Sequence, residues 1–324
     1  MPLVNNLASP KRSSRLSRRT SPEANYLRTS EDCNEECSAV ALLVVGSFAQ
    51  AQIANSNAGT SGPYFFSFDF PMNGVIDTEG TALTPSGMIV GRYITPDGKT
   101  HGFTLINGNF QSIDAPGATS TDAAWVNYYG DIVGGCDCNG ISQVYVLHKG
   151  QFTTFTHPGT TNIAGWGITN AGYVVGTLFD DNFLAAHGYF YRHGNFITID
   201  FPGAQATWPT MAIDASAIVG TYYGTDNVFH GFLRLEGQFS TVDFPNSVFT
   251  WITGINRAGH IVGFYNLSDG IQHGFVLKDG NYISVNIPGA TGTEANGIDT
   301  QDNVVGRYYT SDGHTHGYFL AHVH

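Results

Sequence analysis

Apolar and polar positions alternate along most of the chain in short runs that end at Gly, Asn or Asp. Residues 261–265 read Ile-Val-Gly-Phe-Tyr, residues 273–277 read His-Gly-Phe-Val-Leu, and a Lys-Asp-Gly turn follows at 278–280. Alternation with a period of two, many β-branched and aromatic side chains and frequent turn residues favour β-strands. No segment has a sustained helical period. The pattern therefore predicts an all-β protein.

This strand pattern repeats six times, and three sequence anchors mark each repeat. The first anchor is a proline after a strand: Pro71, Pro116, Pro158, Pro202, Pro245 and Pro288. The second is the glycine of a Val-Gly pair: Gly91, Gly134, Gly176, Gly220, Gly263 and Gly306. The third is a histidine before Gly, replaced by Gln143 in the second repeat: His101, His187, His230, His273 and His316. Successive Val-Gly glycines are 42 to 44 residues apart, so the repeat is about 43 residues long.

Each repeat has room for four strands, which we call A to D. In the fifth repeat they are predicted at 254–256, 261–265, 273–277 and 282–287. Four strands in about 43 residues is the size of a propeller blade. A lone strand D at 64–70 precedes the first repeat, and the chain ends after a strand C at 316–320. We therefore predict a six-bladed β-propeller whose ring is closed by the N-terminal strand joining the C-terminal blade. The alternative is a β-solenoid or an array of stacked sheets.

The repeats resemble the HAF repeat of probable extracellular bacterial proteins, which is named for a His-Ala-Phe motif near Gly-Ile-Asn and Ile-Val-Gly. This chain has His-Gly-Phe at His101, His230 and His273, and His-Gly-Tyr at His187 and His316. The resemblance covers residues 64–324 and implies secretion and a repeat fold. It implies no activity for particular residues.

The first 51 residues differ from the rest and are predicted to be a leader. Six of the 14 basic residues lie there, followed by an apolar core at 38–48 and Ala49-Gln50-Ala51. This order is typical of a secretory signal, although an acidic stretch at 31–36 nearly touches the apolar core. A disordered tail with a stray apolar patch is the alternative. We expect a linker at 52–63, a propeller at 64–324, and a location that is extracellular or in the cell envelope.

Composition narrows the choice of partners. Charged residues make up only 12% of the chain, aromatic residues 13%, and the net charge is −12. This charge disfavours nucleic acid and anionic membranes as partners. No segment after the leader is long and apolar enough to predict a membrane span. We expect a monomer that binds a glycan or an extracellular protein.

Tryptophans are the first candidate ligand-binding residues. The A–B and C–D connections are predicted to be tight turns on one face of the ring, which leaves the longer loops on the other. Four tryptophans lie near the start of strand A in successive repeats, at unequal offsets: Trp125, Trp166, Trp208 and Trp251. If strand A is innermost, they surround the mouth of the central channel, where indole faces suit sugar rings. Tyr128 of the divergent second repeat is a further candidate. Packing between blades is the alternative role of the tryptophans.

Acidic residues form the second candidate set. Four aspartates lie two residues before the anchor proline: Asp69, Asp114, Asp200 and Asp243. A ring of carboxylates could bind Ca²⁺ through hard oxygen ligands, and two of them could act as acid and base. Ordinary turn chemistry is the stronger alternative. We expect no cofactor other than this possible Ca²⁺.

Histidines and cysteines recur or cluster but offer weaker evidence of a site. The histidines occupy one equivalent position in five repeats, so we expect each to hold a neighbouring loop rather than to share a metal ion. Cys136 and Cys138 lie in the second repeat, and a local disulfide between them is predicted despite its strain.

Known catalytic and nucleotide-binding motifs are absent from the sequence. It has no Gly-x-Ser-x-Gly, no Walker loop and no His-Glu-x-x-His. No basic residue recurs in every repeat, and no arginine clamp for an anionic ligand is evident. The leading hypothesis is non-enzymatic binding of a glycan, peptide or envelope component through the loop face. The alternatives are a secreted polysaccharide hydrolase or lyase that uses loop-face aspartates, and a purely structural repeat protein.

Overall fold

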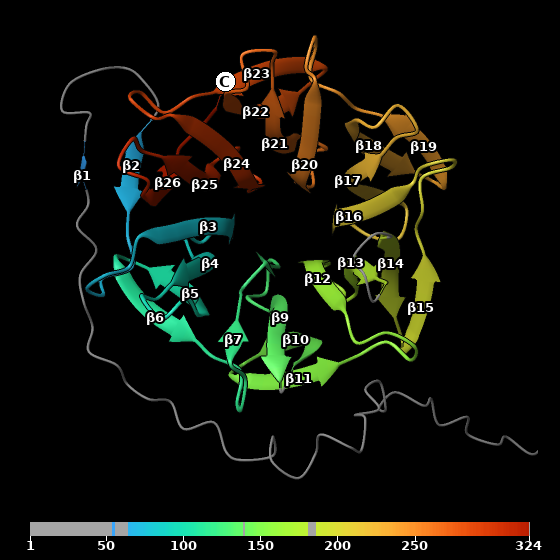
Figure 1. Ribbon diagram of the computed structural model, residues 1–324, viewed down its shortest axis with the longest axis horizontal. Helices are drawn as coiled ribbons and strands as arrows, with labels where there is room; N and C mark the ends of the chain where they lie inside the picture. Colours follow the sequence, from blue (N-terminus) through green and yellow to red (C-terminus); the bar gives the residue numbers. More distant parts are fainter. Residues whose placement is uncertain (1–53, 56–63, 139, 181–185, 324) are drawn as a thin grey trace, which may run out of the picture.

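The structure is a computed structural model that describes residues 54–55, 64–138, 140–180 and 186–323 (Figure 1). The predicted leader, with its apolar core at 38–48, lies outside the described residues, as does most of the 52–63 linker. Every helix or strand among the described residues is a β-strand. No helix in this part of the chain could therefore cross a bilayer.

The strands follow one another in units of four, which we number in chain order. The first unit is β3 (Asp77–Leu83), β4 (Ile89–Ile94), β5 (Thr100–Ile106) and β6 (Asn109–Ile113). The second is β7 (Ser120–Thr121) with β8 (Trp125–Val126), β9 (Ile132–Cys138), β10 (Ile141–His148) and β11 (Gln151–Phe155). The third is β12 (Ile163–Ile168), β13 (Val174–Phe179), β14 (Ala186–Arg192) and β15 (Asn195–Thr198).

The remaining units follow the same order. The fourth is β16 (Ala206–Ala212), β17 (Ala217–Tyr223), β18 (Phe229–Leu235) and β19 (Gln238–Thr241). The fifth is β20 (Phe249–Ile255), β21 (Ile261–Asn266), β22 (Gln272–Lys278) and β23 (Asn281–Val285). The sixth is β24 (Gly292–Ile298), β25 (Val304–Tyr309) and β26 (Thr315–Leu320), and β2 (Phe65–Phe68) pairs antiparallel with β26. The short β1 (Ala54–Asn55) pairs with β2.

The units are arranged radially, with the first strand of each unit nearest a central axis (Figure 1). Each of these inner strands contacts the inner strand of the next unit, and β24 contacts β3. A single parallel bridge between Thr315 and Asp77 links the last unit to the first. Hydroxyl groups join neighbouring inner strands as well, since Thr81 Oγ1 donates to the Ala123 carbonyl and Thr253 Oγ1 to the Ala295 carbonyl, both at 2.7 Å.

The Val-Gly anchor has a steric cause. The inner strand has a register shift, as between Ile252 and Gly254 in β20, that presses one of its carbonyls against the second strand. A Cβ atom on Gly263 would lie only 2.1 Å from the carbonyl oxygen of Trp251. Only glycine fits there, so the anchor recurs wherever this bulge recurs.

The histidine and aspartate anchors pair with each other on the outer part of the units. The histidine Nδ1 lies 2.6–2.9 Å from the aspartate two residues before the proline: His101 with Asp114, His187 with Asp200, His230 with Asp243, and His316 with Asp69. In the fifth unit His273 contacts Asn286 instead, at 2.7 Å. These contacts connect the third and fourth strands of five units and belong to the scaffold.

Candidate functional site

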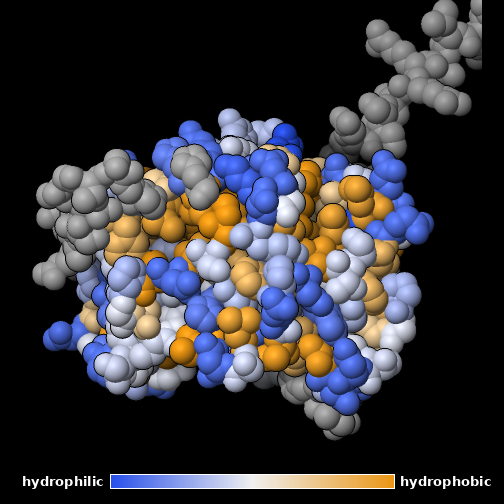
Figure 2. All heavy atoms as spheres, turned by 90° about the horizontal axis from the view of Figure 1, so that it is seen from above, coloured by the Kyte–Doolittle hydropathy of each residue, from blue (hydrophilic) through white to orange (hydrophobic). Residues whose placement is uncertain are grey.

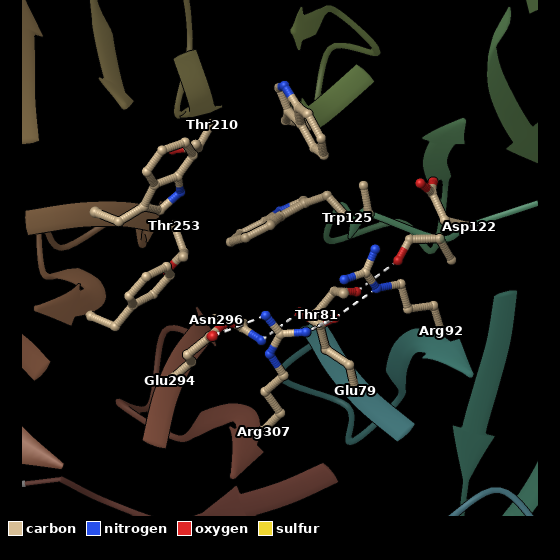
Figure 3. Close-up of a pocket in the computed structure, with 15 residues that line it drawn as sticks. Glu79, Thr81, Arg92, Asp122, Trp125, Thr210, Thr253, Glu294, Asn296 and Arg307 are labelled. Carbon is tan, nitrogen blue, oxygen red and sulfur yellow. Dashed lines mark hydrogen bonds and ion pairs between the residues drawn. The ribbon is translucent and has the colours of Figure 1, made fainter. Parts of the chain in front are cut away.

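A pocket of about 280 Å³ opens at the axis, at the ends of the inner strands that receive the longer loops (Figure 3). Its walls come from all six inner strands and from the strands paired with them. Hydrophobic and hydrophilic surface is interspersed on the outer side of the molecule (Figure 2). At the axis, by contrast, charged and aromatic groups lie on opposite walls of one cavity.

Cross-strand register explains this separation of charged and aromatic groups. One inner-strand position follows a threonine that recurs in five of the six units. In chain order this position carries Glu79, Asp122, Ala164, Trp208, Trp251 and Glu294. Its partner on the second strand, directly after Val-Gly, carries Arg92, Gly135, Thr177, Thr221, Phe264 and Arg307. The sixth, first and second units therefore supply charges, whereas the fourth and fifth supply aromatic rings.

The charged wall is a network centred on Glu79. Arg92 Nε donates to Glu79 Oε2 at 2.7 Å, and Arg307 Nη1 donates to the same oxygen at 3.0 Å. Arg307 Nη2 donates to Glu294 Oε1 at 2.9 Å, so one guanidinium bridges carboxylates of the first and sixth units. Asn296 Nδ2 donates to Glu79 Oε1 at 2.9 Å. The network holds the two units together and fixes the position of every charge.

Burial and neighbouring charges shift the pKa values of Glu79 and Glu294 in opposite directions. Burial alone would raise the pKa of Glu79, but Arg307 and Arg92 outweigh it, and the pKa is lowered. Burial raises the pKa of Glu294, and the charge on Glu79 adds to this rise, while Arg307 only partly opposes it. Glu79 is therefore the stable anion of the network.

Asp122 is a third carboxyl group in the same pocket. Its Oδ1 accepts a hydrogen bond from the Gly135 amide at 2.6 Å. Burial raises the pKa of Asp122, although this amide and the charge on Arg92 oppose the rise. The pocket thus combines carboxyl groups whose pKa values are pushed apart.

The aromatic wall lies opposite this network. Trp251 and Phe264 line the pocket with nearly parallel rings, 14° apart, and Phe229 packs 5.7 Å from Trp251 behind them. Trp166 lines the pocket from the third unit, and its Nε1 donates to Thr177 Oγ1 at 3.0 Å. With its indole N–H already bonded, Trp166 is held in place beside the cavity.

Trp125 forms the floor of the pocket. It is only 7% exposed, and its ring crosses the axis from the second unit toward Gly254 of the fifth. A Cβ atom on Gly254 would lie 2.5 Å from Trp125 Cη2. A smaller cavity of about 80 Å³ lies on the other side of Trp125 and is lined by the tight turns. Trp125 therefore separates the two ends of the channel.

Comparison with solved structures shows the fold of the chain. TolB from Acinetobacter baumannii superposes with a TM-score of 0.54 at 11% identity, over 73% of this chain and 64% of TolB. The β-propeller domain of the Trilobed protease from Pyrococcus furiosus superposes with a TM-score of 0.52 at 10% identity, over 85% of this chain and 94% of that domain. This chain has a propeller-like, all-β fold.

The comparisons give no family. No protein-family model and no curated protein sequence matches the chain. The six-bladed, fucose-recognising lectin of the fungus Aleuria aurantia has a TM-score of 0.49 at 14% identity, over 76% of this chain and 92% of the lectin. At such identities the likeness extends to the fold alone.

The propeller-like arrangement separates the candidate ligand-binding residues. Trp166 and Trp251 line the central pocket, and Trp125 closes it from below. Trp208 packs against Trp251 with ring centroids 5.7 Å apart and planes tilted by 42°, and it supports the aromatic wall. Tyr128 lies on a tight turn at the opposite end of the channel, where it lines the smaller cavity with Trp125 and does not join Trp166 and Trp251. All four tryptophans belong to inner strands, which begin earlier than the sequence predicts: β20 starts at Phe249 rather than at residue 254.

The aspartates proposed for Ca²⁺ do not gather at one point. Each aspartate lies beside a different anchor histidine, so the four are spread over four units: Asp69, Asp114, Asp200 and Asp243. Among the described residues no three His, Cys, Asp or Glu side chains are placed to hold one metal ion. The Ca²⁺ site stays a prediction without structural support.

The structure has no disulfide between Cys136 and Cys138, both of which are buried. Cys136 and Cys138 lie two residues apart on the extended strand β9, where they pair with Gln143 and Ile141 of β10. Residues two apart on a strand are separated by about 6.6 Å and point the same way, which is poor geometry for a disulfide.

Sequence reasoning missed the charged wall, in which Arg92 and Arg307 meet at Glu79. Arg92 and Arg307 both follow Val-Gly and precede Tyr, in the first and last units. Glu79 and Glu294 likewise both follow a threonine. This matched pair of departures from the repeat could have revealed the site, since a closed ring brings the first and last units together.

Proposed function

We propose that this protein binds carbohydrate, without catalysis, in the central pocket of a six-bladed propeller. The observation that carries this proposal is the opposition of an aromatic wall and a charged wall across one small cavity. A sugar ring has a face of C–H groups, which suits Trp251 and Trp166, and hydroxyl groups at its edge. Carboxylate and guanidinium groups can accept from and donate to those hydroxyls.

Several features support the six-bladed, closed architecture that this proposal assumes. β2 pairs with β26 in register from Phe65–Leu320 to Phe68–Gly317, as a closing strand requires. The Arg307 bridge between Glu79 and Glu294 also joins the first and last units. We propose in addition that the protein is an HAF-repeat protein that is secreted or held in the cell envelope. N-terminal sequencing of the protein exported by a bacterial host tests this, and a mature start near residue 52 is expected.

Carbohydrate binding can be tested with the full chain on a glycan array, followed by calorimetry with the best sugar. Trp251→Ala should weaken that affinity by about 10- to 100-fold, because the sugar loses its stacking surface. Tyr128→Ala is the matched control, since it removes an aromatic side chain at the opposite end of the channel. Equal affinity of the wild type and Trp251→Ala would contradict the proposal.

Hydrolysis or lysis of a polysaccharide is the second candidate function. It is favoured by one observation, namely that Asp122 and Glu79 line one pocket with pKa values shifted up and down respectively. Such a pair can divide the roles of proton donor and anion. Release of reducing ends or unsaturated products from a polysaccharide panel, abolished by Asp122→Asn, would replace binding by catalysis as the function.

A further inference from the structure

A second pocket of about 250 Å³ adjoins the central one and is lined by residues of the first, second and third units. Arg92, Asp122 and Trp166 line both cavities, so the two meet over these three side chains. The central pocket alone, at about 280 Å³, lies just below the ~300–1,000 Å³ range of ligand sites. Together the two cavities form a longer depression that runs from the axis toward the outer part of β9 and β12.

The second pocket exists because the second and third units have small residues at the two register positions described above. Gly135 occupies the position that holds Arg, Thr or Phe in the other units, and Ala164 the position that holds Glu, Asp or Trp. Packing does not require glycine at 135. A Cβ atom on Gly135 would meet nothing closer than Asp122 Oδ2 at 3.5 Å, an ordinary contact, whereas one on Gly134 would lie 2.1 Å from the Asp122 carbonyl. The absence of a side chain at Gly135 thus leaves space without serving the fold.

The second unit also lacks the tyrosine–histidine ring pair that four other units have. In four units the tyrosine of Val-Gly-x-Tyr stacks on the anchor histidine with centroids 5.1–5.2 Å apart: Tyr93 on His101, Tyr222 on His230, Tyr265 on His273, and Tyr308 on His316. In the second unit the corresponding register pair is Cys136 with Gln143, and both line the second pocket. The departures of this unit from the repeat therefore coincide with the cavity.

The lining of the second pocket mixes apolar and neutral polar groups with three charged side chains, those of Arg92, Asp122 and Asp137. Ser120, Ser142 and Asn162 contribute hydroxyl and amide groups, and Trp166 contributes a ring at the boundary. Arg92 is anchored at Nε by Glu79 and has a side chain that is 37% exposed, so its outer nitrogens face the junction of the pockets. Neutral donors and acceptors beside an aromatic ring suit hydroxyl groups better than an ionic ligand.

We propose that the second pocket is a subsite for the next unit of a carbohydrate chain. The ligand is then an oligosaccharide of neutral sugars that spans both cavities across Arg92, Asp122 and Trp166. This inference rests on the carbohydrate binding proposed above and specifies the length and path of the ligand.

Gly135→Phe tests the subsite, because it introduces the residue that the fifth unit has at this position and fills the cavity. Calorimetry on the full chain compares the methyl glycoside of the best array sugar with its disaccharide and tetrasaccharide. The wild type should bind the tetrasaccharide about tenfold more tightly than the methyl glycoside. In Gly135→Phe the tetrasaccharide should bind no more tightly than the methyl glycoside. Gly135→Ala is the matched control and should keep the gain.

A double variant, Ser142→Ala/Asn162→Ala, removes polar groups without filling space and serves if Gly135→Phe does not fold. It should reduce the gain by about threefold and leave the methyl glycoside affinity unchanged. A wild type that binds the methyl glycoside and the tetrasaccharide equally, or a gain that survives both variants, would overturn the subsite and leave the central site intact. If no carbohydrate binds at all, the proposed function itself fails.

Discussion

The outer and inner parts of this protein use the repeat in opposite ways. In the outer part the same contacts recur from unit to unit, as in the pairs His101–Asp114 and His230–Asp243. At the axis one register position changes from Glu79 to Trp251 to Glu294 around the ring. Both regions are built on the same strands with the same register. The difference indicates that repetition maintains the scaffold, whereas departures from it make the proposed binding site.

The largest effect that we expect comes from Trp125→Ala. Trp125 is 7% exposed and fills the axis between two cavities, so its removal leaves a large void. The free energy of unfolding should fall by about 3–5 kcal/mol. Chemical denaturation of the wild type and the variant measures this. A loss below about 1 kcal/mol would show that Trp125 is not a packed partition.

Glu79→Gln should have the next largest effect, because it leaves two arginines beside a neutral side chain. We expect a loss of about 3 kcal/mol, at the low end for a broken buried ion pair, since the Arg92 side chain is 37% exposed. Glu294→Gln is the matched comparison. Burial raises the pKa of Glu294, so neutralising this group should cost less. Equal losses in the two variants would contradict the assignment of Glu79 as the central anion.

The outer part could be predicted from the sequence far better than the axis. The proline, glycine and histidine anchors each reflect a local contact, such as Gly263 against the Trp251 carbonyl, so they recur at one spacing. The axial residues are recognisable only after strands are placed in register. With strand A predicted to begin at residue 254, Trp251 falls outside the predicted strand, and the prediction gives Glu79 no place on the axis. The bridge from Arg307 to Glu79 also depends on contact between the first and last units, which no local pattern specifies.

A smaller, pH-dependent effect is expected from His230 in the scaffold. Its Nδ1 lies 2.7 Å from Asp243 and its Nε2 3.0 Å from Asp226. Burial alone would lower the pKa of His230, but the two aspartates outweigh it, and the pKa is raised above its usual 6.5. The resulting stabilisation is fully present below pH 6.5 and is lost as the pH rises through the folded-state pKa. His230→Gln should therefore cost about 1 kcal/mol at pH 5.5 and less at pH 8.5.

Thermal unfolding at the two pH values checks this prediction. Asp226→Asn/Asp243→Asn provides the control background, in which the cost of His230→Gln should no longer change with pH. A cost that rises toward pH 8.5 in the wild-type background would reverse the sign and refute the charge-based account.

The smallest effect is expected at the far end of the channel. Tyr128 is 65% exposed on a tight turn, where it meets Tyr129 edge-on with ring centroids 5.5 Å apart. Its backbone amide donates to Asn170 Oδ1, a contact that any side chain at 128 preserves. Tyr128→Ala should change stability by no more than about 0.5 kcal/mol and leave carbohydrate affinity unchanged. Calorimetry with the sugar that Trp251→Ala binds more weakly would then distinguish the two faces. If Tyr128→Ala alone weakened binding, the ligand would lie on the tight-turn face, and the charged and aromatic walls would belong to the scaffold.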